Sequence, residues 1–269
     1  MPKIQVNGVE LFYDISGAGQ PLLLLSGFAC DHSCWSLMMP LLAKKNLVIR
    51  VDNRGAGRSS LPTYPYLIKD LAGDISALLK YLQIQKVSVI GHSMGAQIAQ
   101  ILTLNYSEKV KNLILLSSWK EANSIFHNII ETWGELPKVL DYQQYQKVIL
   151  PWLFTDKFLS TPQAFAQIIK RAVNYSFRPN PQCLYYQSQA ILNSNISGDM
   201  PNISCPTLVM VGRQDILTPV AFSQQLLKFI PQAELRVIDD CGHGLLLESP
   251  HTVALNILDF LARASATNI

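Results

Sequence analysis

The stretch that decides the fold is VSVIGHSMGAQIA, residues 87–99. Its apolar first part, residues 87–90, predicts a buried strand, and the pattern that follows predicts a helix over about residues 94–106. Between them, GHSMG at residues 91–95 has the Gly-x-Ser-x-Gly spacing of a sharp strand-to-helix turn that carries a nucleophilic serine. Glycine suits such a turn because larger side chains would collide with the neighbouring strand and helix. Ser93 is therefore the candidate nucleophile, at a helix N-terminus that favours developing negative charge.

A serine hydroxyl is a poor nucleophile near neutral pH, so Ser93 needs a general base, and the base needs an acidic partner. Of the five histidines, His243 lies in the glycine-flanked loop DCGHG, residues 240–244, just after the last predicted strand. An imidazole there can reach the carboxyl edge of a sheet, so His243 is the candidate base. The other histidines lie at less suitable places: His32, His92, His127 and His251.

The candidate acid is Asp215, which follows the predicted strand 207–211 in a loop at the carboxyl end of that strand. An alternative is Glu121, shortly after the predicted strand 113–116, because the acid of such a triad can also follow that earlier strand. Two aspartates close to His243 in the sequence are expected to cap a turn or face water instead: Asp239 and Asp240.

The rest of the chain alternates short apolar runs with longer helical patterns, which predicts an α/β fold with a mostly parallel sheet flanked by helices. A hairpin across Asn7-Gly8 opens the chain and adds two antiparallel strands. Eight strands are predicted, at residues 4–6, 11–14, 21–25, 47–51, 87–90, 113–116, 207–211 and 234–238. Between and after them, helices are predicted at about residues 69–82, 94–106, 219–229 and 250–264.

The alternation stops over residues 119–199, where helical patterns and Pro or Asn breaks occur without a convincing strand. This predicts a helical cap inserted into an α/β core of residues 1–118 and 200–269. The cap holds five of the ten tyrosines and three of the four tryptophans. These aromatic side chains could line a pocket. They could equally form only the cap's own small core.

Composition excludes several classes of protein. With 269 residues, 49% hydrophobic and 15% charged, the chain can bury a large core and is not disordered. A net charge of +3, spread without a long basic run, argues against a nucleic-acid partner. The longest apolar run, residues 21–28, is too short for a membrane helix, and a secretory signal is lacking, so a cytoplasmic protein is expected. The five cysteines have no CxxC spacing and are expected to be buried, reduced thiols.

Two further motifs make the chain resemble an α/β-hydrolase over about residues 4–265. DNRGAGRS, residues 52–59, is similar to the family's D-x-R-G-x-G-x-S segment. CGH at 241–243, followed by ESP at 248–250, resembles its C-terminal histidine signature. The helical cap after the sixth strand is similar to that of the enol-lactonase, carrier-protein methyl ester esterase and carboxylesterase branch.

The resemblance implies a serine ester hydrolase that works through an acyl-enzyme, with the triad Ser93, Asp215 and His243 and with neither cofactor nor metal. It also implies an oxyanion hole made by the backbone N–H groups of Phe28 and Met94.

The chain departs from the family's pattern at one place, and the family's pattern implies structural roles for two arginines. Ser26-Gly27 stands where the family has His-Gly, which changes the packing beneath the Phe28 donor. The family's use of residues 52–59 implies that Arg54 and Arg58 buttress loops. Asp31 and His32 could suggest a metal site, but adjacent residues of this kind are expected to face water.

Other activities stay open. The same triad could act on a lactone or thioester, or transfer the acyl group. A receptor with this fold could bind a ligand and turn it over little or not at all. Serine at the turn argues against haloalkane dehalogenases and epoxide hydrolases, which need a carboxylate there. Both a monomer and a homodimer are compatible with the sequence.

The expected substrate is a small molecule with a small to medium, mainly uncharged acyl group. The cap holds seven basic against six acidic residues and is rich in Gln, Tyr and Trp. The local excess of positive charge comes from Lys170, Arg171 and Arg178. If these converged on the pocket or its rim, an acidic substrate or an acidic acyl carrier protein would be the better interpretation.

Overall fold

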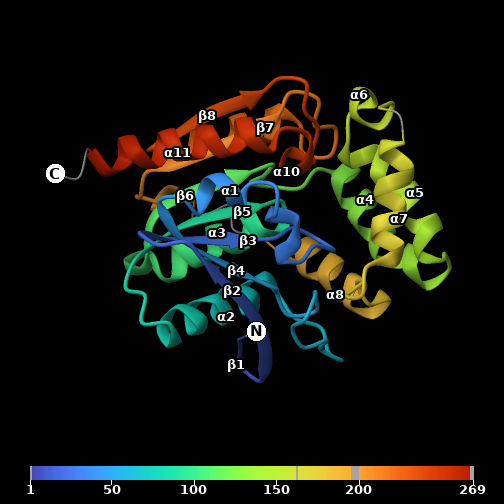
Figure 1. The fold of residues 1–269 in the computed structure, drawn as a ribbon, viewed down its shortest axis with the longest axis horizontal. Coiled ribbons are helices and arrows are strands. Elements are labelled where there is room, and N and C mark those ends of the chain that lie inside the picture. The colour runs from blue at the N-terminus through green and yellow to red at the C-terminus, as the bar shows by residue number, and fades with distance from the viewer. Residues whose placement is uncertain (1, 162, 195–199, 267–269) are drawn as a thin grey trace.

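A computed structural model describes residues 2–161, 163–194 and 200–266, built around one eight-stranded sheet in the order β1-β2-β4-β3-β5-β6-β7-β8 (Figure 1). Strands β1 and β2, and β2 and β4, pair antiparallel, and all the other neighbours pair parallel. The strands are β1 (Lys3–Val6), β2 (Val9–Ser16), β3 (Gln20–Leu25), β4 (Asn46–Val51), β5 (Val87–His92), β6 (Val110–Leu116), β7 (Thr207–Gly212) and β8 (Ala233–Ile238). Each predicted strand lies inside an observed one, so the predicted mostly parallel, eight-stranded sheet is confirmed.

The central strands are apolar along their whole length because the sheet is covered on both faces. In β3, Leu22 and Leu24 pack into one core and Leu23 and Leu25 into the other, and all four are fully buried. The first core contains α1 (Met39–Leu42), α10 (Leu245–Glu248) and α11 (Pro250–Ala266). The second contains α2 (Ile68–Tyr81), α3 (Met94–Asn105) and α9 (Val220–Phe229).

The four predicted core helices agree with α2, α3, α9 and α11 to within two residues at each end. The sequence pattern did not predict three short elements of four residues each: α1, α10 and the 3-10 turn η1 (His32–Trp35). Four residues make little more than one helical turn, so no apolar period can be read from them.

The described residues between β6 and β7 form five α-helices, which we call the helical insert: α4 (Ser124–Glu135), α5 (Tyr142–Leu153), α6 (Asp156–Leu159), α7 (Ala164–Asn174) and α8 (Pro181–Leu192). Figure 1 shows α4, α5, α6 and α7 together to one side of the sheet. Within the described residues of 119–194 the insert has no strand, as predicted, whereas residues 195–199 of the predicted cap lie outside the described residues. No helix in the described part of the chain is long and apolar enough to cross a bilayer.

Candidate active site

The turn that carries Ser93 has a strained backbone. Strand β5 ends at His92 and helix α3 begins at Met94, and Ser93 between them has φ 54° and ψ −117°. A residue other than glycine rarely adopts positive φ, and such strain concentrates at functional sites. The backbone N–H of Ser93 donates to the carbonyl of Leu116 at 2.9 Å, which holds the turn against the end of β6.

Glycine is sterically required on both sides of Ser93. A Cβ on Gly91 would lie 2.2 Å from the carbonyl oxygen of Gly95, and one on Gly95 would lie 2.0 Å from that of Leu25. A Cβ on Gly27 would lie 3.2 Å from the Cβ of Ser93, so the loop after β3 lies directly against the turn. The glycines of GHSMG therefore have the role that the sequence predicted for them.

His243 is held by Asp215. Its Nδ1 lies 2.9 Å from Oδ2 of Asp215, a carboxylate that is only 3% exposed. Thr218 donates its backbone N–H to Oδ1 of the same carboxylate at 2.7 Å and its hydroxyl to Oδ2 at 2.8 Å. Burial alone would raise the pKa of Asp215, but His243 and the Thr218 donors outweigh it and lower that pKa below its ordinary value. A charged Asp215 keeps the proton of a neutral His243 on Nδ1 and leaves Nε2 free to accept one.

The other acidic candidates do not contact His243. The side chain of Glu121 is 60% exposed and pairs with Lys120 at 2.8 Å. Asp239 and Asp240 form exposed ion pairs with Arg213 and Lys157, respectively, in keeping with the expectation that they face water. Of the candidate acids, Asp215 is the one that lies beside the imidazole.

Ser93 and His243 line one cavity of about 350 Å³. Its walls are mainly apolar and come from the loop after β3 and from the insert, and they include Phe28, Trp133, Tyr142, Ile149, Leu153 and Tyr175. The aromatic residues of the insert also pack among themselves, as the 4.6 Å separation of the Trp119 and Phe126 rings shows. Both interpretations of these aromatics therefore hold, for different residues.

The sequence analysis did not identify the residues of the insert that line this cavity. A signal for four of them is present in α5, where residues 142, 146, 149 and 153 follow one another at helical spacing and all face the cavity. These four residues form one face of α5 that combines an aromatic, an amide and two aliphatic side chains, and this pattern is visible in the sequence.

One of the two predicted oxyanion donors belongs to the turn itself and the other to the loop that packs against it. Phe28 lines the cavity, and Met94 is the buried first residue of α3. Ser26, in place of the family's histidine, holds the loop from beneath: its hydroxyl accepts from the indole N–H of Trp35 and donates to the carbonyl of Asp31, both at 3.0 Å. Ser26 therefore connects the loop to Trp35 and Asp31 in this chain.

The chain matches a known family over most of its length. The family described as alpha/beta hydrolase fold matches residues 20–250. This chain belongs to that α/β-hydrolase family. It is 29% identical over 277 residues to the 2-hydroxymuconate semialdehyde hydrolase of Pseudomonas sp. (strain CF600), covering 99% of this chain and 95% of that one.

Two solved structures of enzymes that are named for different activities have the same fold. A thermophilic esterase from Thermogutta terrifontis is 25% identical, with a TM-score of 0.87 and coverage of 98% of this chain and 99% of that one. The enol-lactonase from Burkholderia xenovorans LB400 is 25% identical, with a TM-score of 0.88 and coverage of 97% and 100%. This α/β-hydrolase therefore shares its architecture with enzymes that are named for several kinds of substrate.

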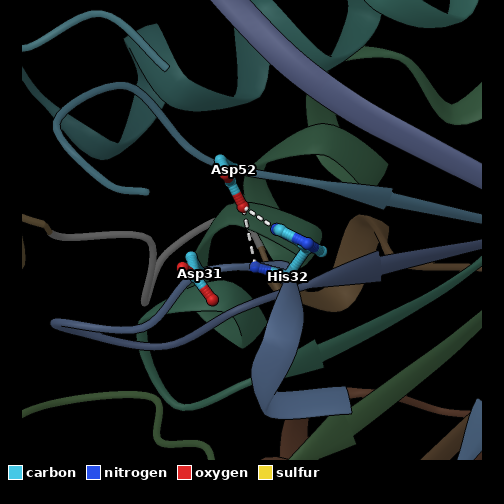
Figure 2. A group of neighbouring side chains, drawn as sticks. All are labelled: Asp31, His32 and Asp52. Carbon is cyan, nitrogen blue, oxygen red and sulfur yellow. Dashed lines mark hydrogen bonds and ion pairs between the residues drawn. The ribbon is translucent and has the colours of Figure 1, made fainter. Parts of the chain in front are cut away.

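The group formed by Asp31, His32 and Asp52 offers three ligand atoms within 4.8 Å of one another (Figure 2). The expectation that Asp31 and His32 face water is wrong, because Asp31 is only 7% exposed and His32 is half-buried. Figure 2 shows His32 bonded to Asp52, whose Oδ1 accepts from both the backbone N and the Nδ1 of His32 at 2.7 Å. Burial and the neighbouring Asp31, which accepts from the Tyr175 hydroxyl, raise the pKa of Tyr175 to about 12.

The carboxylates of this group already have protein donors on every oxygen. Oδ2 of Asp52 accepts from the backbone N of Arg58 at 2.9 Å, and Oδ1 of Asp31 accepts from the N and Oγ of Ser33 at 2.8 and 2.6 Å. A metal ion would have to share these oxygens with their present donors. The group instead ties the loop after β3 to residues 52–59 and, through Tyr175, to the helical insert.

The arginines of residues 52–59 have structural contacts, as the resemblance implied. Arg54 forms a buried bidentate ion pair with Asp74, with both N–O distances 2.6 Å. The guanidinium of Arg58 lies over the rings of Phe12 and Phe177, 4.8 and 4.7 Å from their centroids.

The cysteines are all free, but the prediction that they are all buried is wrong for three. Cys183 and Cys241 are buried, whereas Cys30, Cys34 and Cys205 are partly exposed. Cys30 and Cys34 line the cavity, because the loop after β3 turns its side chains toward the insert.

His92 gives the stability of this hydrolase a predictable pH dependence. Burial, together with the nearby His243, lowers the pKa of His92 from 6.5 to about 3. Between these values the unfolded chain binds a proton that the folded chain does not, so stability decreases as the pH falls through that window. Gln at position 92 cannot titrate. Between pH 7.5 and pH 5 we therefore expect the free energy of unfolding of His92→Gln to fall by about 2 kcal/mol less than that of the wild type. Urea unfolding of both proteins at pH 7.5 and pH 5 measures this, and equal losses in the two proteins would refute it.

Proposed function

We propose that this hydrolase cleaves carboxylic esters through an acyl-enzyme intermediate on Ser93. The observation that carries the proposal is that His243, bonded to the buried and charged Asp215, lines the same cavity as Ser93 on its strained turn. Ser93 Oγ attacks the acyl carbonyl while His243 Nε2 takes the hydroxyl proton, and His243 then returns that proton to the leaving alcohol. A water molecule, activated in turn by His243, attacks the acyl-enzyme and releases the acid.

The developing oxyanion would be held by backbone donors. The N–H groups of Phe28 and Met94 are the proposed pair, supported by the close approach of Gly27 to Ser93 and by the position of Met94 at the start of α3. The dipole of the twelve-residue α3 adds to this stabilisation, because its positive end points at Ser93.

The domain organisation that we propose is an α/β-hydrolase core of residues 1–118 and 200–269 with a cap of residues 119–199. The supporting observation is that the helical insert supplies one wall of the cavity and the loops at the carboxyl ends of the strands supply the other. The cap would then select the substrate, and the core would hold the reacting groups.

The proposed acyl group is small to medium and mainly uncharged. Of the three basic residues singled out by the sequence, Arg171 lines the cavity. Arg178 lies over the ring of Tyr142, with 5.9 Å between guanidinium and centroid, beside a separate pocket, and Lys170 lines neither pocket. Because the three do not converge, apolar contacts would dominate acyl binding.

Labelling and turnover together test the ester hydrolase proposal. A fluorophosphonate probe should label Ser93, and short p-nitrophenyl esters should be turned over repeatedly. Labelling without turnover of esters would instead favour the receptor alternative. Matched lactones and thioesters assayed beside the esters rank the alternative acyl substrates.

Substrate charge is tested by comparing neutral esters with matched ω-carboxylated esters. We expect a preference for the neutral esters, and we expect Arg171→Gln to change the ratio of the two kcat/KM values by less than about fivefold, as for an exposed ion pair. Lys170→Gln, next to it and outside the cavity, is the matched control. A preference for the carboxylated ester of about 100-fold that disappears in Arg171→Gln would overturn the proposal and assign an anionic substrate.

A further inference from the structure

Two side chains form hydrogen bonds to the backbone of the loop that carries His243. The carbonyl of His243 accepts from Nε2 of His92 at 2.9 Å. The backbone N–H of the preceding residue, Gly242, donates to Oε2 of Glu248 at 2.5 Å. Neither contact involves the imidazole ring, which Asp215 already orients.

His92 ties the turn of the candidate nucleophile to the loop of the candidate base. It is the residue before Ser93, it is buried, and its ring centroid lies 5.1 Å from that of His243. Donation to a carbonyl requires a proton on Nε2, which fixes the tautomer of His92 and leaves its Nδ1 as an acceptor. That Nδ1 has no hydrogen-bond partner within the described residues. In the described part of the chain, the carbonyl of His243 is the one acceptor bonded to Nε2 of His92.

Glu248 connects the same loop to the helical insert. Its Oε1 accepts from both the backbone N and the hydroxyl of Thr155, at 2.7 and 2.8 Å. Next to these bonds, the backbone N–H of Gly244 donates to the carbonyl of Leu153 at 2.7 Å. The Glu248 carboxylate and one backbone hydrogen bond therefore join the loop that carries His243 to residues 153–155, at the end of α5 and just before α6.

The loop and the insert are in steric contact at both glycines that flank His243. A Cβ on Gly242 would lie 3.0 Å from the carbonyl oxygen of Leu153, and one on Gly244 would lie 2.3 Å from the ring of Phe154. The insert therefore packs directly against the backbone on both sides of His243.

We propose that His92 and Glu248 are positioning residues that hold the backbone of His243 within reach of Ser93, and that Glu248 makes this position depend on the docking of the insert at Thr155. This inference rests on the proposed function, since it assigns roles relative to Ser93 and His243. A ring anchored only through Asp215 can still move with its backbone. A displacement of about 1 Å at a reacting group can cost on the order of 100-fold in rate.

The first test compares two substitutions at His92. His92→Leu removes the N–H donor, whereas His92→Gln keeps an N–H donor at the end of the side chain. We expect His92→Leu to lose on the order of 100-fold in kcat, with KM changed by less than about threefold, and His92→Gln to recover at least about tenfold of that loss. His127→Gln on the exposed face of α4 is the matched control. Equal kcat values for His92→Leu and the wild type, or equal losses in both His92 variants, would overturn the role of His92.

The second test is a double-mutant cycle between Glu248→Gln and Thr155→Val. The amide that Glu248→Gln introduces can accept a hydrogen bond only at its oxygen. Thr155→Val removes the hydroxyl donor and also the N-cap bond that the Thr155 hydroxyl accepts from the backbone N–H of Phe158. Thr155→Val removes this N-cap bond both in the wild type and in Glu248→Gln, so its effect cancels in the cycle. We expect each single variant to lower kcat and the double variant to lower it by clearly less than the product of the two effects. Independent effects on kcat would refute the coupling of insert and base through Glu248.

A readout that needs no turnover separates this inference from the proposed function. NMR of ¹⁵N-histidine-labelled protein should give one sharp Nδ1–H proton signal for His243 in the wild type, assigned by its loss in His243→Gln. We expect that signal to broaden or vanish in His92→Leu and in Glu248→Gln and to persist in His92→Gln, with thermal unfolding showing that each variant is folded. Unchanged signals in both of the first two variants would overturn the inference even if the ester hydrolase proposal holds. Broadening in an enzyme that cleaves no ester would support the inference while the proposed function fails.

Discussion

Ser93→Ala should abolish ester hydrolysis and leave the fold intact. The loss expected is on the order of 10⁶ in kcat, as for other serine triads in which nucleophile and base act as one unit. Folding should survive because, within the described residues, the Ser93 side chain makes no hydrogen bond that the substitution would break. Alanine has a smaller side chain than serine, so it should adopt the φ of 54° at this position as readily as serine does.

The measurement is kcat for a p-nitrophenyl ester, with fluorophosphonate labelling and thermal unfolding on the same preparations. Ser124→Ala, at the exposed start of α4, is the matched control and should behave as the wild type. His243→Ala should lose about as much activity as Ser93→Ala, because the base and the nucleophile work together. If purified Ser93→Ala kept a tenth of the activity, the acyl-enzyme mechanism would be wrong.

Asp215→Asn should lose roughly 10⁴-fold in kcat, the effect of replacing an aspartate that fixes the tautomer of a catalytic histidine. The Asn amide would present an N–H to Nδ1 of His243, so the imidazole would carry its proton on Nε2 and could not accept the Ser93 proton. The carbonyl oxygen of Asn can still accept from the backbone N–H groups of Leu217 and Thr218, which bond Asp215 at 3.0 and 2.7 Å, so the loop should keep its shape.

Glu121→Gln is the comparison that decides between the two acids suggested by the sequence. Glu121 is exposed and pairs with Lys120, and we expect its substitution to leave kcat nearly unchanged. Steady-state rates for both variants across pH 5–9, with near-UV circular dichroism as a control for folding, give the ranking. A large loss in Glu121→Gln with little loss in Asp215→Asn would place the acid after β6.

Local features of this chain could be predicted because their causes lie within a few residues. The turn at Ser93 is specified by Gly91 and Gly95, whose missing side chains leave room for its own backbone and for that of β3. The strands could be predicted because a parallel sheet buried on both faces needs continuous apolar runs, such as the four leucines of β3. The histidine loop could be located from its flanking glycines and its place after the last strand.

Contacts between distant segments decided the rest. Asp31 is buried because Tyr175, 144 residues away along the chain, donates to it, and no local pattern at Asp31 contains that information. Sequence order allowed both Asp215 and Glu121 as the acid, and only the folded arrangement places one of them beside His243. The sequence by itself determined the fold class, the eight strands and the candidates Ser93 and His243, since periodicity and turn sterics are properties of short stretches. Only the tertiary structure decided which residues form the cavity walls, and that His92 and Glu248 bond to the backbone of the loop that carries His243. Side chains that are far apart in sequence meet only once the sheet and the insert have packed.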